Sequence, residues 1–378
     1  MLEESKAVSR TSSLQECQAD LGATFASVAG WTMAQFYTDA IAEHLAVRTA
    51  VGLVDLSHHG SIRIWGGEAA QFLNGLVTNN VKTLQVGAGM PAGFLTGHGK
   101  VKALCRILNL GKEYLVINEP QTHDAVFKYV FPFSYAGDFK AEDASEEYRV
   151  LSVQGPKSPL VMKEVCFEPV PSLEEHGSFD TLIAGHRVLV VRASRTGGIG
   201  FDLLVHNHAL RDVWDFILLK GRFHSIVPFG LAALDSLRIE AGIPEYGTDV
   251  DETNMMLEVG LEDAVSFAKG CYTGQEAVAM ATYRGHISKR LSGLVVAATV
   301  VPRKGDIIVK DGKEIGQVTS ALRSPSLGSV ICLAYVKYGF FEPGTSMEIQ
   351  IESDVLPAIV VELPFYREGG PKEVKVKP

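Results

Sequence analysis

Hydrophobic and polar residues alternate along this chain with two periods, one typical of strands and one typical of helices. Residues 61–67 alternate as a strand and lead into a helix-like run at 68–76, and residues 93–119 predict an antiparallel meander. A second series of strand, helix, strands and helix follows between residues 148 and 221. Because the same order of elements occurs twice, the sequence predicts an α+β protein with two similar halves.

The pattern changes near Arg290, where helix-like runs give way to short strands separated by turn sequences such as "KDGKE" and "EPGT". This texture predicts a small all-β domain, most simply a C-terminal β-barrel. We therefore expect a flexible arm at 1–22, a first α+β half at 23–146, a second at 147–290, the barrel at 291–366 and a tail at 367–378.

The composition of the chain argues against several classes of protein and of binding partner. The net charge is -9 and the pI about 5.7, so we expect no direct contact with nucleic acid. The chain has 5 cysteines, which are far apart and form no C-x-x-C pair, so neither a zinc ribbon nor a disulfide framework is expected. No apolar run is long enough to span a bilayer, and the first 22 residues lack the apolar core of a signal peptide. We expect a soluble, cytoplasmic protein.

The stretch "AKGCYTGQEAVAM" at 268–280 carries the most suggestive chemistry. Thr273 and Glu276 have the spacing of a capping box, which predicts a helix beginning at Gly274. Cys271 would then precede a helix N-terminus beside Lys269, and both features favour a thiolate. The alternative is that Cys271 is a small buried side chain at a tight turn.

Three further groups of polar residues have alternative interpretations. Arg284, His286, Lys289 and Arg290 can form an anion site or a solvated strand edge. Arg238 can pair with Asp235 on a helix surface or hold a ligand carboxylate. The acidic turn of Asp249, Asp251 and Glu252 is expected to be solvated.

Two other motifs do not favour a metal site or a phosphate-binding site. His58 and His59 are adjacent, so on a strand they face opposite sides and do not favour a metal site. The glycine-rich "RTGGIG" at 195–200 lacks the lysine and the following helix of a phosphate-binding loop, and it fits a turn between strands. We expect no metal.

Several segments in order, including "GWTMAQFY", "EHLAVRTAVGLVDLSHHGSIRIWG", "LRIEAGIPEYGTDVDE" and "GQVTSALRSPSLGSVICLAYV", resemble the glycine-cleavage T-protein (aminomethyltransferase) superfamily. The resemblance runs from about Ala29 to Leu363. It implies a cloverleaf of two α+β halves and a C-terminal barrel around a folate site. The implied cofactor is tetrahydrofolate or a one-carbon derivative.

Within that superfamily, "KGCYTGQE" is similar to the hallmark of the YgfZ-type folate-binding proteins, which are linked to iron–sulfur cluster assembly or repair. The motif cysteine of that type falls on Cys271, which the resemblance makes a working thiolate. The match is completed by Lys269, Gly270, Tyr272, Gly274, Gln275 and Glu276. The implied partners are folate and iron–sulfur assembly or client proteins. We expect a tetrahydrofolate-binding protein of this type. The alternatives are a folate-dependent aminomethyltransferase, methyltransferase or demethylase, and a non-enzymatic, folate-gated scaffold.

The sequence also departs from the aminomethyltransferase pattern. Where the resemblance implies a catalytic aspartate, the chain reads "GHGKVKALCRIL", with Lys102 and Ala103 at the corresponding positions. The loop that would supply a pterin-binding glutamate is shortened, leaving Asp202 as its substitute. Arg238 matches the arginine that binds a folate carboxylate, with Arg284 as its helper. The residues expected to contact folate are thus Arg238, Arg284, Tyr272, Lys269, Asp202 and Lys102.

Overall fold

The computed structural model describes residues 9–283, 287–352, 354–367 and 370–371, and its chain contacts divide the protein into two compact units. The first unit comprises Met1–Ser61, Asp143–Ser194 and Ile199–Asp235. The second comprises Ile62–Glu142, Arg195–Gly198 and Ser236–Pro378. The units interleave along the chain, whereas the boundaries predicted above are consecutive.

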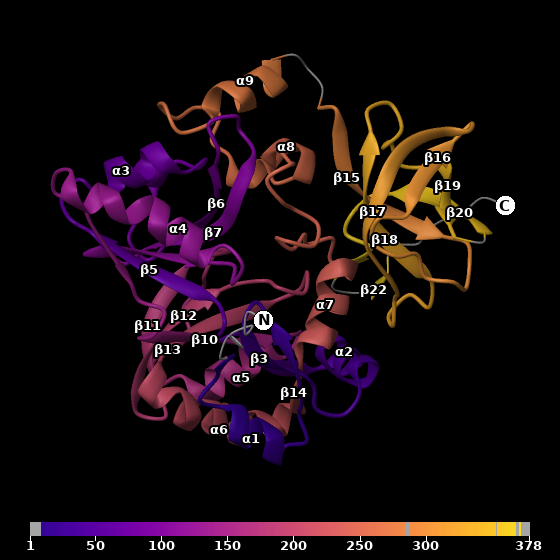
Figure 1. Ribbon diagram of the computed structural model, residues 1–378. Helices are drawn as coiled ribbons and strands as arrows, with labels where there is room; N and C mark the ends of the chain where they lie inside the picture. The colour runs from indigo at the N-terminus through magenta and orange to yellow at the C-terminus, as the bar shows by residue number, and fades with distance from the viewer. Residues whose placement is uncertain (1–8, 284–286, 353, 368–369, 372–378) are drawn as a thin grey trace, which may run out of the picture. The chain divides into compact units, whose positions relative to one another are not determined.

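A six-stranded sheet forms the centre of the first unit, with the strand order β11-β12-β13-β10-β4-β14. Its neighbours are antiparallel except β14 and β4. Helices α5 and α6 pack against each other and on this sheet (Figure 1), burying Val161, Trp214 and Leu203 in one apolar core. The elements are β4 (Val51–Asp55), β10 (Tyr148–Gln154), α5 (Ser158–Val165), β11 (Ser178–Ile183), β12 (His186–Arg192), β13 (Gly200–His206), α6 (Leu210–Gly221) and β14 (Ile226–Pro228).

The rest of the first unit is a three-stranded sheet and two helices. Helix α2 begins where the Asp39 carboxylate accepts hydrogen bonds from the amides of Ile41 and Ala42, which lack partners in the first helical turn. The elements are β1 (Arg10–Thr11), α1 (Gln15–Asp20), β2 (Thr24–Val28), β3 (Trp31–Phe36) and α2 (Ala40–Thr49), with short 3₁₀ turns η3 (Asn207–Ala209) and η4 (Arg222–His224).

The second unit contains a five-stranded sheet with the order β6-β7-β8-β5-β9. Phe94, Leu73 and Val126 are buried in its core, on a strand and on the two helices that pack against the sheet. The elements are β5 (Gly60–Trp65), α3 (Ala69–Leu76), η1 (Val81–Thr83), β6 (Gly89–Leu95), β7 (Val101–Asn109), β8 (Glu113–Asn118), α4 (His123–Val130), η2 (Phe131–Tyr135) and β9 (Lys140–Asp143).

The predicted repeat of elements is confirmed. The series β5–α3–β6–β7–β8–α4–β9 matches β10–α5–β11–β12–β13–α6–β14, and the two sheets share a strand order, with β4 inserted in the second. Each series turns from its first strand towards its helix at a glycine of positive φ, Gly66 at 115° and Gly155 at 119°. A side chain at Gly66 would lie 2.3 Å from the carbonyl oxygen of Asp138, so this turn needs glycine for space as well as conformation.

The predicted C-terminal β-barrel is also confirmed, as a closed barrel with the order β15-β18-β17-β16-β19-β20 (Figure 1). Alternating residues such as Leu294, Ile308 and Cys332 fill its interior. The strands are β15 (Lys289–Val296), β16 (Ile307–Lys310), β17 (Lys313–Arg323), β18 (Val330–Lys337), β19 (Ser346–Ile351) and β20 (Asp354–Val361), followed by a small pair, β21 (Tyr366–Arg367) and β22 (Gly370–Pro371).

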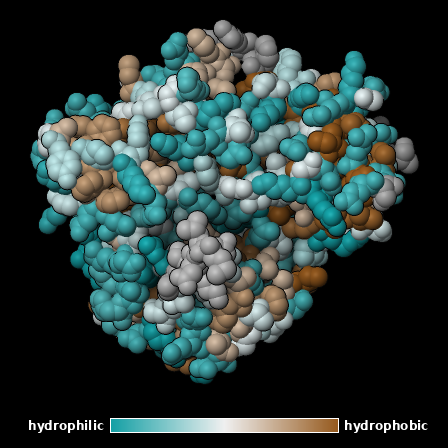
Figure 2. Space-filling model, in the orientation of Figure 1, coloured by the Kyte–Doolittle hydropathy of each residue, from teal (hydrophilic) through white to brown (hydrophobic). Residues whose placement is uncertain are grey.

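The segment between the sheets and the barrel contains α7 (Leu231–Glu240), α8 (Met256–Val259), η5 (Glu262–Ala264) and α9 (Gln275–Tyr283). Gly242 has a positive φ of 68° two residues beyond α7, a conformation that is common just after a helix C-terminus. Among the described helices, none has the length and apolar character to cross a bilayer. Hydrophilic residues dominate the face in Figure 2, with hydrophobic ones in smaller groups among them.

Candidate functional site

The segment around Cys271 is anchored to the C-terminal end of helix α3 and to the loop that follows it. The amide of Ser266 donates to the carbonyl of Thr78 at 3.0 Å, and the amide of Thr273 donates to the carbonyl of Gly75 at 3.1 Å. Helix α9 begins at Gln275, one residue after the predicted start. Cys271 is exposed, so the alternative interpretation of a buried cysteine is wrong.

Two glycines bring this segment close to the turn between β6 and β7. Gly274 has a φ of +81°, and a side chain there would lie 2.6 Å from the carbonyl oxygen of Thr96. Gly99, in the facing turn, has a φ of +73°, and a side chain on it would lie 2.5 Å from the Cβ of Ala277. Only glycine satisfies both the backbone conformation and the space at each position. The glycine before the glutamine of the motif is therefore needed for packing.

Lys269 occupies a buried position at the end of helix α3. Its Nζ donates hydrogen bonds to the carbonyl oxygens of Asn74, Val77 and Asn79, at 2.6, 2.7 and 2.7 Å. These carbonyls lie at or just beyond the C-terminus of α3, where a cation complements the helix dipole. Burial lowers the pKa of Lys269 to about 8. The geometry is that of a helix-capping cation with all three N–H groups in use, and contact with folate stays a prediction.

Tyr272 is buried beside this lysine. The Lys269 Nζ lies 4.8 Å from the centre of its ring, within the range of a cation–π contact. The side chain is 8% exposed and packs in a core that includes Leu95 and Val278. Burial raises the pKa of the Tyr272 hydroxyl, so this group is neutral at pH 7. Its predicted folate contact also stays a prediction.

Lys102 is linked to the motif segment through one aromatic residue. Its Nζ lies 4.5 Å from the centre of the Tyr129 ring, and the Tyr129 hydroxyl is 3.2 Å from Oγ1 of Thr273. The three residues come from β7, from α4 and from the turn before α9. The fold therefore brings together two parts of the sequence that were singled out separately, the lysine at the expected carboxylate position and the "KGCYTGQE" motif.

Arg238 is buried and binds a carboxylate of its own chain. Its Nη1 donates to Oδ2 of Asp249 at 2.7 Å and to the carbonyl of Ile243 at 3.1 Å. Its Nη2 donates to Oε2 of Glu245 at 3.4 Å and to Oγ of Ser320 at 3.3 Å. Arg238 is 8% exposed, so it does not lie on the helix surface where a pair with Asp235 was predicted, and its partners Asp249 and Glu245 follow the helix.

The expectation of a solvated acidic turn is wrong for Asp249 and right for its neighbours. Asp249 is 2% exposed, and its Oδ1 accepts hydrogen bonds from Oγ1 of Thr319 at 2.5 Å and Oγ of Ser320 at 2.6 Å. Asp251 and Glu252 are exposed. The burial of Asp249 joins the "EYGTDVDE" segment to barrel strand β17, and single-sequence patterns carry no signal for such long-range pairing.

The remaining predicted residues belong to other elements of the fold. Asp202 is buried on β13 of the first unit, where its Oδ1 accepts from Oγ of Ser152 at 2.7 Å. Arg284 and His286 fall outside the described residues. The Nζ of Lys289 lies 4.5 Å from the ring centre of Tyr335, and Arg290 pairs with Glu262 at 3.1 Å. These last two contacts fit the solvated strand edge better than an anion site.

One carboxyl group near Arg238 was missed by the sequence analysis. Glu119 directly follows β8, and desolvation raises its pKa, with Arg195 acting in the opposite direction and Glu245 raising it further. Perturbed carboxyl groups among mixed charges are typical of functional sites. The sequence signal, a glutamate at the end of the buried run "YLVINE", is too common to have identified it.

Within the part of the chain that the structure describes, no group of three or more His, Cys, Asp or Glu side chains could hold a metal ion. His58 and His59 lie with ring centres 5.0 Å apart in an edge-to-face arrangement.

Comparison with known proteins identifies the family. Residues 14–269 match the GCVT N-terminal domain, and residues 289–367 match the glycine cleavage T-protein C-terminal barrel domain. An aminomethyltransferase of Saccharopolyspora erythraea is 34% identical over 96% of this chain and 99% of its own length. One from Halothermothrix orenii is 33% identical over 93% of this chain and 98% of its own length.

The fold has a counterpart among solved structures. The glycine cleavage system aminomethyltransferase T from Bartonella henselae superposes with a TM-score of 0.88 at 24% identity, covering 96% of this chain and all of that chain. That likeness concerns the fold. With the two domain matches and the full-length relatives, it follows that the chain belongs to the glycine-cleavage T-protein family.

Proposed function

We propose that the protein is a tetrahydrofolate-dependent aminomethyltransferase, which moves a one-carbon unit from an aminomethyl donor to the folate. The observation that carries this proposal is the 34% identity with an aminomethyltransferase over nearly the whole of both chains. That similarity supports the aminomethyltransferase, which the sequence analysis gave as an alternative, better than it supports the main prediction of a YgfZ-type folate-binding protein.

Lys102 leaves the proposed reaction without a carboxylate at the expected position, and Glu119 is our candidate to replace it. Strands β7 and β8 are antiparallel, with Cys105 opposite Asn118. Glu119 is the next residue after Asn118, so it lies beside the strand that carries Lys102, at the same end of the sheet. A carboxyl group with a raised pKa keeps its proton to a higher pH than an ordinary carboxyl group, which favours a role as the proton donor to a folate nitrogen or a leaving amine.

Arg238 is our candidate to bind the negatively charged tail of the folate. Asp249, with its side chain fully buried, holds one end of the guanidinium at 2.7 Å. Glu245 is 39% exposed and contacts the other end at only 3.4 Å. A ligand carboxylate can replace Glu245 while Asp249 keeps the arginine in position, and a planar guanidinium suits such a contact.

Two measurements on the purified chain test the proposal in sequence. Isothermal titration with tetrahydrofolate tests binding, and formation of methylene-tetrahydrofolate from an aminomethyl donor tests transfer. Binding together with transfer supports the proposal. Absence of binding at high micromolar folate contradicts it, and binding without transfer contradicts the enzymatic part alone.

A second candidate is a YgfZ-type role in iron–sulfur cluster assembly or repair in the cytoplasm, through folate, Cys271 and client proteins. The observation that favours it is the "KGCYTGQE" octapeptide together with the exposed position of its cysteine. Replacing Cys271 with Ala tests this role in cells that lack the protein. Loss of cluster-dependent enzyme activity in the variant supports it, and full rescue by the variant contradicts it.

A further inference from the structure

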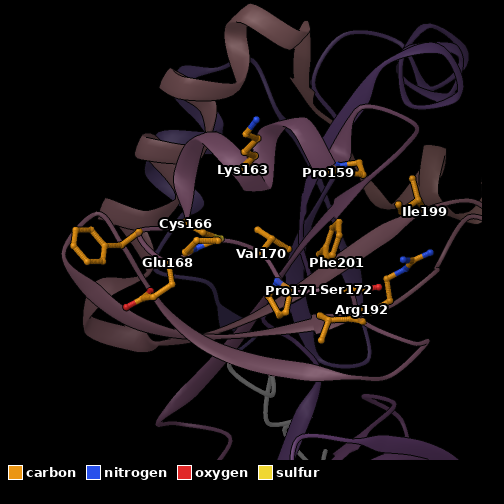
Figure 3. Close-up of a pocket in the computed structure, with 13 residues that line it drawn as sticks. Pro159, Lys163, Cys166, Glu168, Val170, Pro171, Ser172, Arg192, Ile199 and Phe201 are labelled. Carbon is orange, nitrogen blue, oxygen red and sulfur yellow. The ribbon is translucent and has the colours of Figure 1, made fainter.

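A pocket of about 700 Å³ lies in the first unit, between helix α5 and the loop that connects it to β11 (Figure 3). Its volume is in the range of sites for small molecules. No residue that the sequence analysis singled out for folate lines it, so an inference drawn from it does not rest on the proposed function.

The loop that forms one wall is held in place by its ends. Near its start, the amide of Phe167 donates to the carbonyl of Leu182 on β11 at 3.0 Å. At its end, His176 donates to the carbonyl of Arg192 and Arg192 donates to that of Gly177, each at 2.8 Å. Pro169 and Pro171 lie between these anchors and restrict the backbone. The wall is therefore preformed, which lowers the entropy cost of binding a ligand.

Apolar side chains form the middle of the pocket. Val170, Pro171 and Phe201 lie at its centre, with Ile199 and Pro159 beside them (Figure 3). Val170 and Ile199 pack against the apolar core of the first unit, to which Phe201 belongs. Apolar surface of this kind favours a hydrocarbon or aromatic body on the ligand.

The charged groups at the two ends of the pocket differ in what they contact. Glu168 points away from the centre in Figure 3, and its carboxylate accepts hydrogen bonds from the Thr181 hydroxyl and from the amide of Leu182 at 3.2 Å. Arg192 lies at the opposite end, near Ser172 (Figure 3). The negative group is thus engaged by the protein on the outside of the pocket.

One N–H group of the Arg192 side chain has no hydrogen-bond acceptor within the described part of the chain. Its Nε is buried and donates no hydrogen bond to any residue that the structure describes. Oε2 of Glu175 lies 3.7 Å from this nitrogen, beyond hydrogen-bonding distance. Glu175 uses its other oxygen to accept from the amide of Ser194 at 2.7 Å. A buried guanidinium N–H without an acceptor favours an anionic partner.

From these observations we propose that the pocket binds a small amphipathic carboxylate. Its anion pairs with Arg192 and its apolar body lies on Val170, Pro171 and Phe201. A neutral molecule of the same shape leaves the guanidinium without an acceptor and binds more weakly.

Octanoate is the probe for this proposal, and 1-octanol is its uncharged counterpart. In isothermal titration with the full chain, octanoate binds at least about ten-fold more tightly than octanol, because a charge-assisted hydrogen bond separates them. Replacing Arg192 with Met weakens octanoate binding about ten-fold and leaves octanol unchanged. Arg187→Gln is the matched control on the same strand, since Arg187 pairs with Asp180 at 3.0 Å outside the pocket. It leaves both affinities unchanged.

Alkylation then locates the binding site. Cys166 lines the pocket, and burial raises the pKa of its thiol to about 12, so it reacts slowly, whereas Cys271 is exposed and serves as the internal reference. Octanoate slows iodoacetamide labelling of Cys166 relative to Cys271, and Val170→Trp, which fills the pocket, removes this protection. If the wild-type chain does not bind octanoate, or if Arg192→Met binds it as tightly as the wild type, the proposal is wrong. Unchanged labelling of Cys166 places the site elsewhere and also overturns it.

Discussion

The ammonium group of Lys102 lies 4.5 Å from the centre of the Tyr129 ring, and Tyr129 in turn reaches Thr273 in the segment that carries Cys271. A positive charge is therefore held beside the motif, at the position where the family resemblance implies a carboxylate. The protein retains the fold of its family.

Replacing Lys102 with Met tests whether this charge acts on the folate. A cation–π contact at a partly exposed site is worth about 0.5–1 kcal/mol, so the free energy of unfolding falls by no more than about that amount. Tetrahydrofolate binding weakens about ten-fold if the ammonium contacts the ligand. Lys128→Met, at an exposed position of α4, is the control and changes neither quantity. Unchanged affinity in Lys102→Met would remove this lysine from the folate site.

Lys269 is expected to stabilise the fold. Lys269→Met leaves carbonyls at the end of α3 without a donor and lowers the free energy of unfolding by about 3 kcal/mol, measured by urea denaturation. Lys220→Met, on the exposed surface of α6, is the control. A change as small as that of the control would mean that the cap contributes little.

The same lysine predicts a pH dependence. Its pKa is about 8 in the folded protein and 10.5 for an ordinary lysine. Between these values the unfolded chain binds more protons than the folded chain, so the free energy of unfolding rises with pH across this window. The difference in unfolding free energy between the wild type and Lys269→Met therefore increases from pH 8 to pH 10. A flat or falling difference contradicts the lowered pKa.

The buried pair of Arg238 and Asp249 is expected to be costly to break. Arg238→Met leaves the Asp249 carboxylate buried without its cation, and the free energy of unfolding falls by about 3–5 kcal/mol. Arg290→Gln breaks the exposed pair with Glu262 and costs less than about 1 kcal/mol. Equal losses in the two variants would show that Asp249 is not desolvated.

The raised pKa of Glu119 predicts that its ionised carboxylate destabilises the folded protein at neutral pH. Because its folded pKa is raised, the folded chain loses stability as the pH rises above the ordinary carboxyl value of 4.5. Glu119→Gln therefore melts at a higher temperature than the wild type at pH 7, and the two melting temperatures converge as the pH falls below 4.5. If Glu119 transfers the proton, the same variant loses about 100-fold in the rate of aminomethyl transfer. Higher stability without loss of rate would assign Glu119 no catalytic role.

Local patterns predicted the elements more fully than they predicted the site. Hydrophobic periodicity and turn residues located the repeated series and the barrel, because these signals depend on nearby residues. The contacts of Asp249 with Thr319 and of Lys269 with Asn74 join residues far apart in the sequence, and no local pattern encodes them. Charge alone made Asp249 look solvated, although its hydrogen bonds allow it to be buried.

The same limit applies to the "KGCYTGQE" motif. From the sequence, Lys269 was predicted to favour a thiolate at Cys271. In the structure, its three N–H groups instead donate hydrogen bonds to backbone carbonyls. Gly274 is explained by close packing against the β6–β7 turn. Much of the motif therefore serves the fold, and Cys271 is its exposed member with thiol chemistry.

Cys271 separates the two candidate functions. Because it is exposed, Cys271→Ala changes the free energy of unfolding by no more than about 0.5 kcal/mol. An aminomethyltransferase that works through Glu119 keeps its rate in this variant. A large loss of rate would instead give the thiol a part in the transfer.

The central claim is most directly tested by measuring methylene-tetrahydrofolate formation by the wild-type chain from tetrahydrofolate and an aminomethyl donor. The account predicts that the product accumulates over many turnovers and that formation depends on both substrates. A chain that binds tetrahydrofolate and forms no product above the uncatalysed rate would contradict the assignment of an aminomethyltransferase.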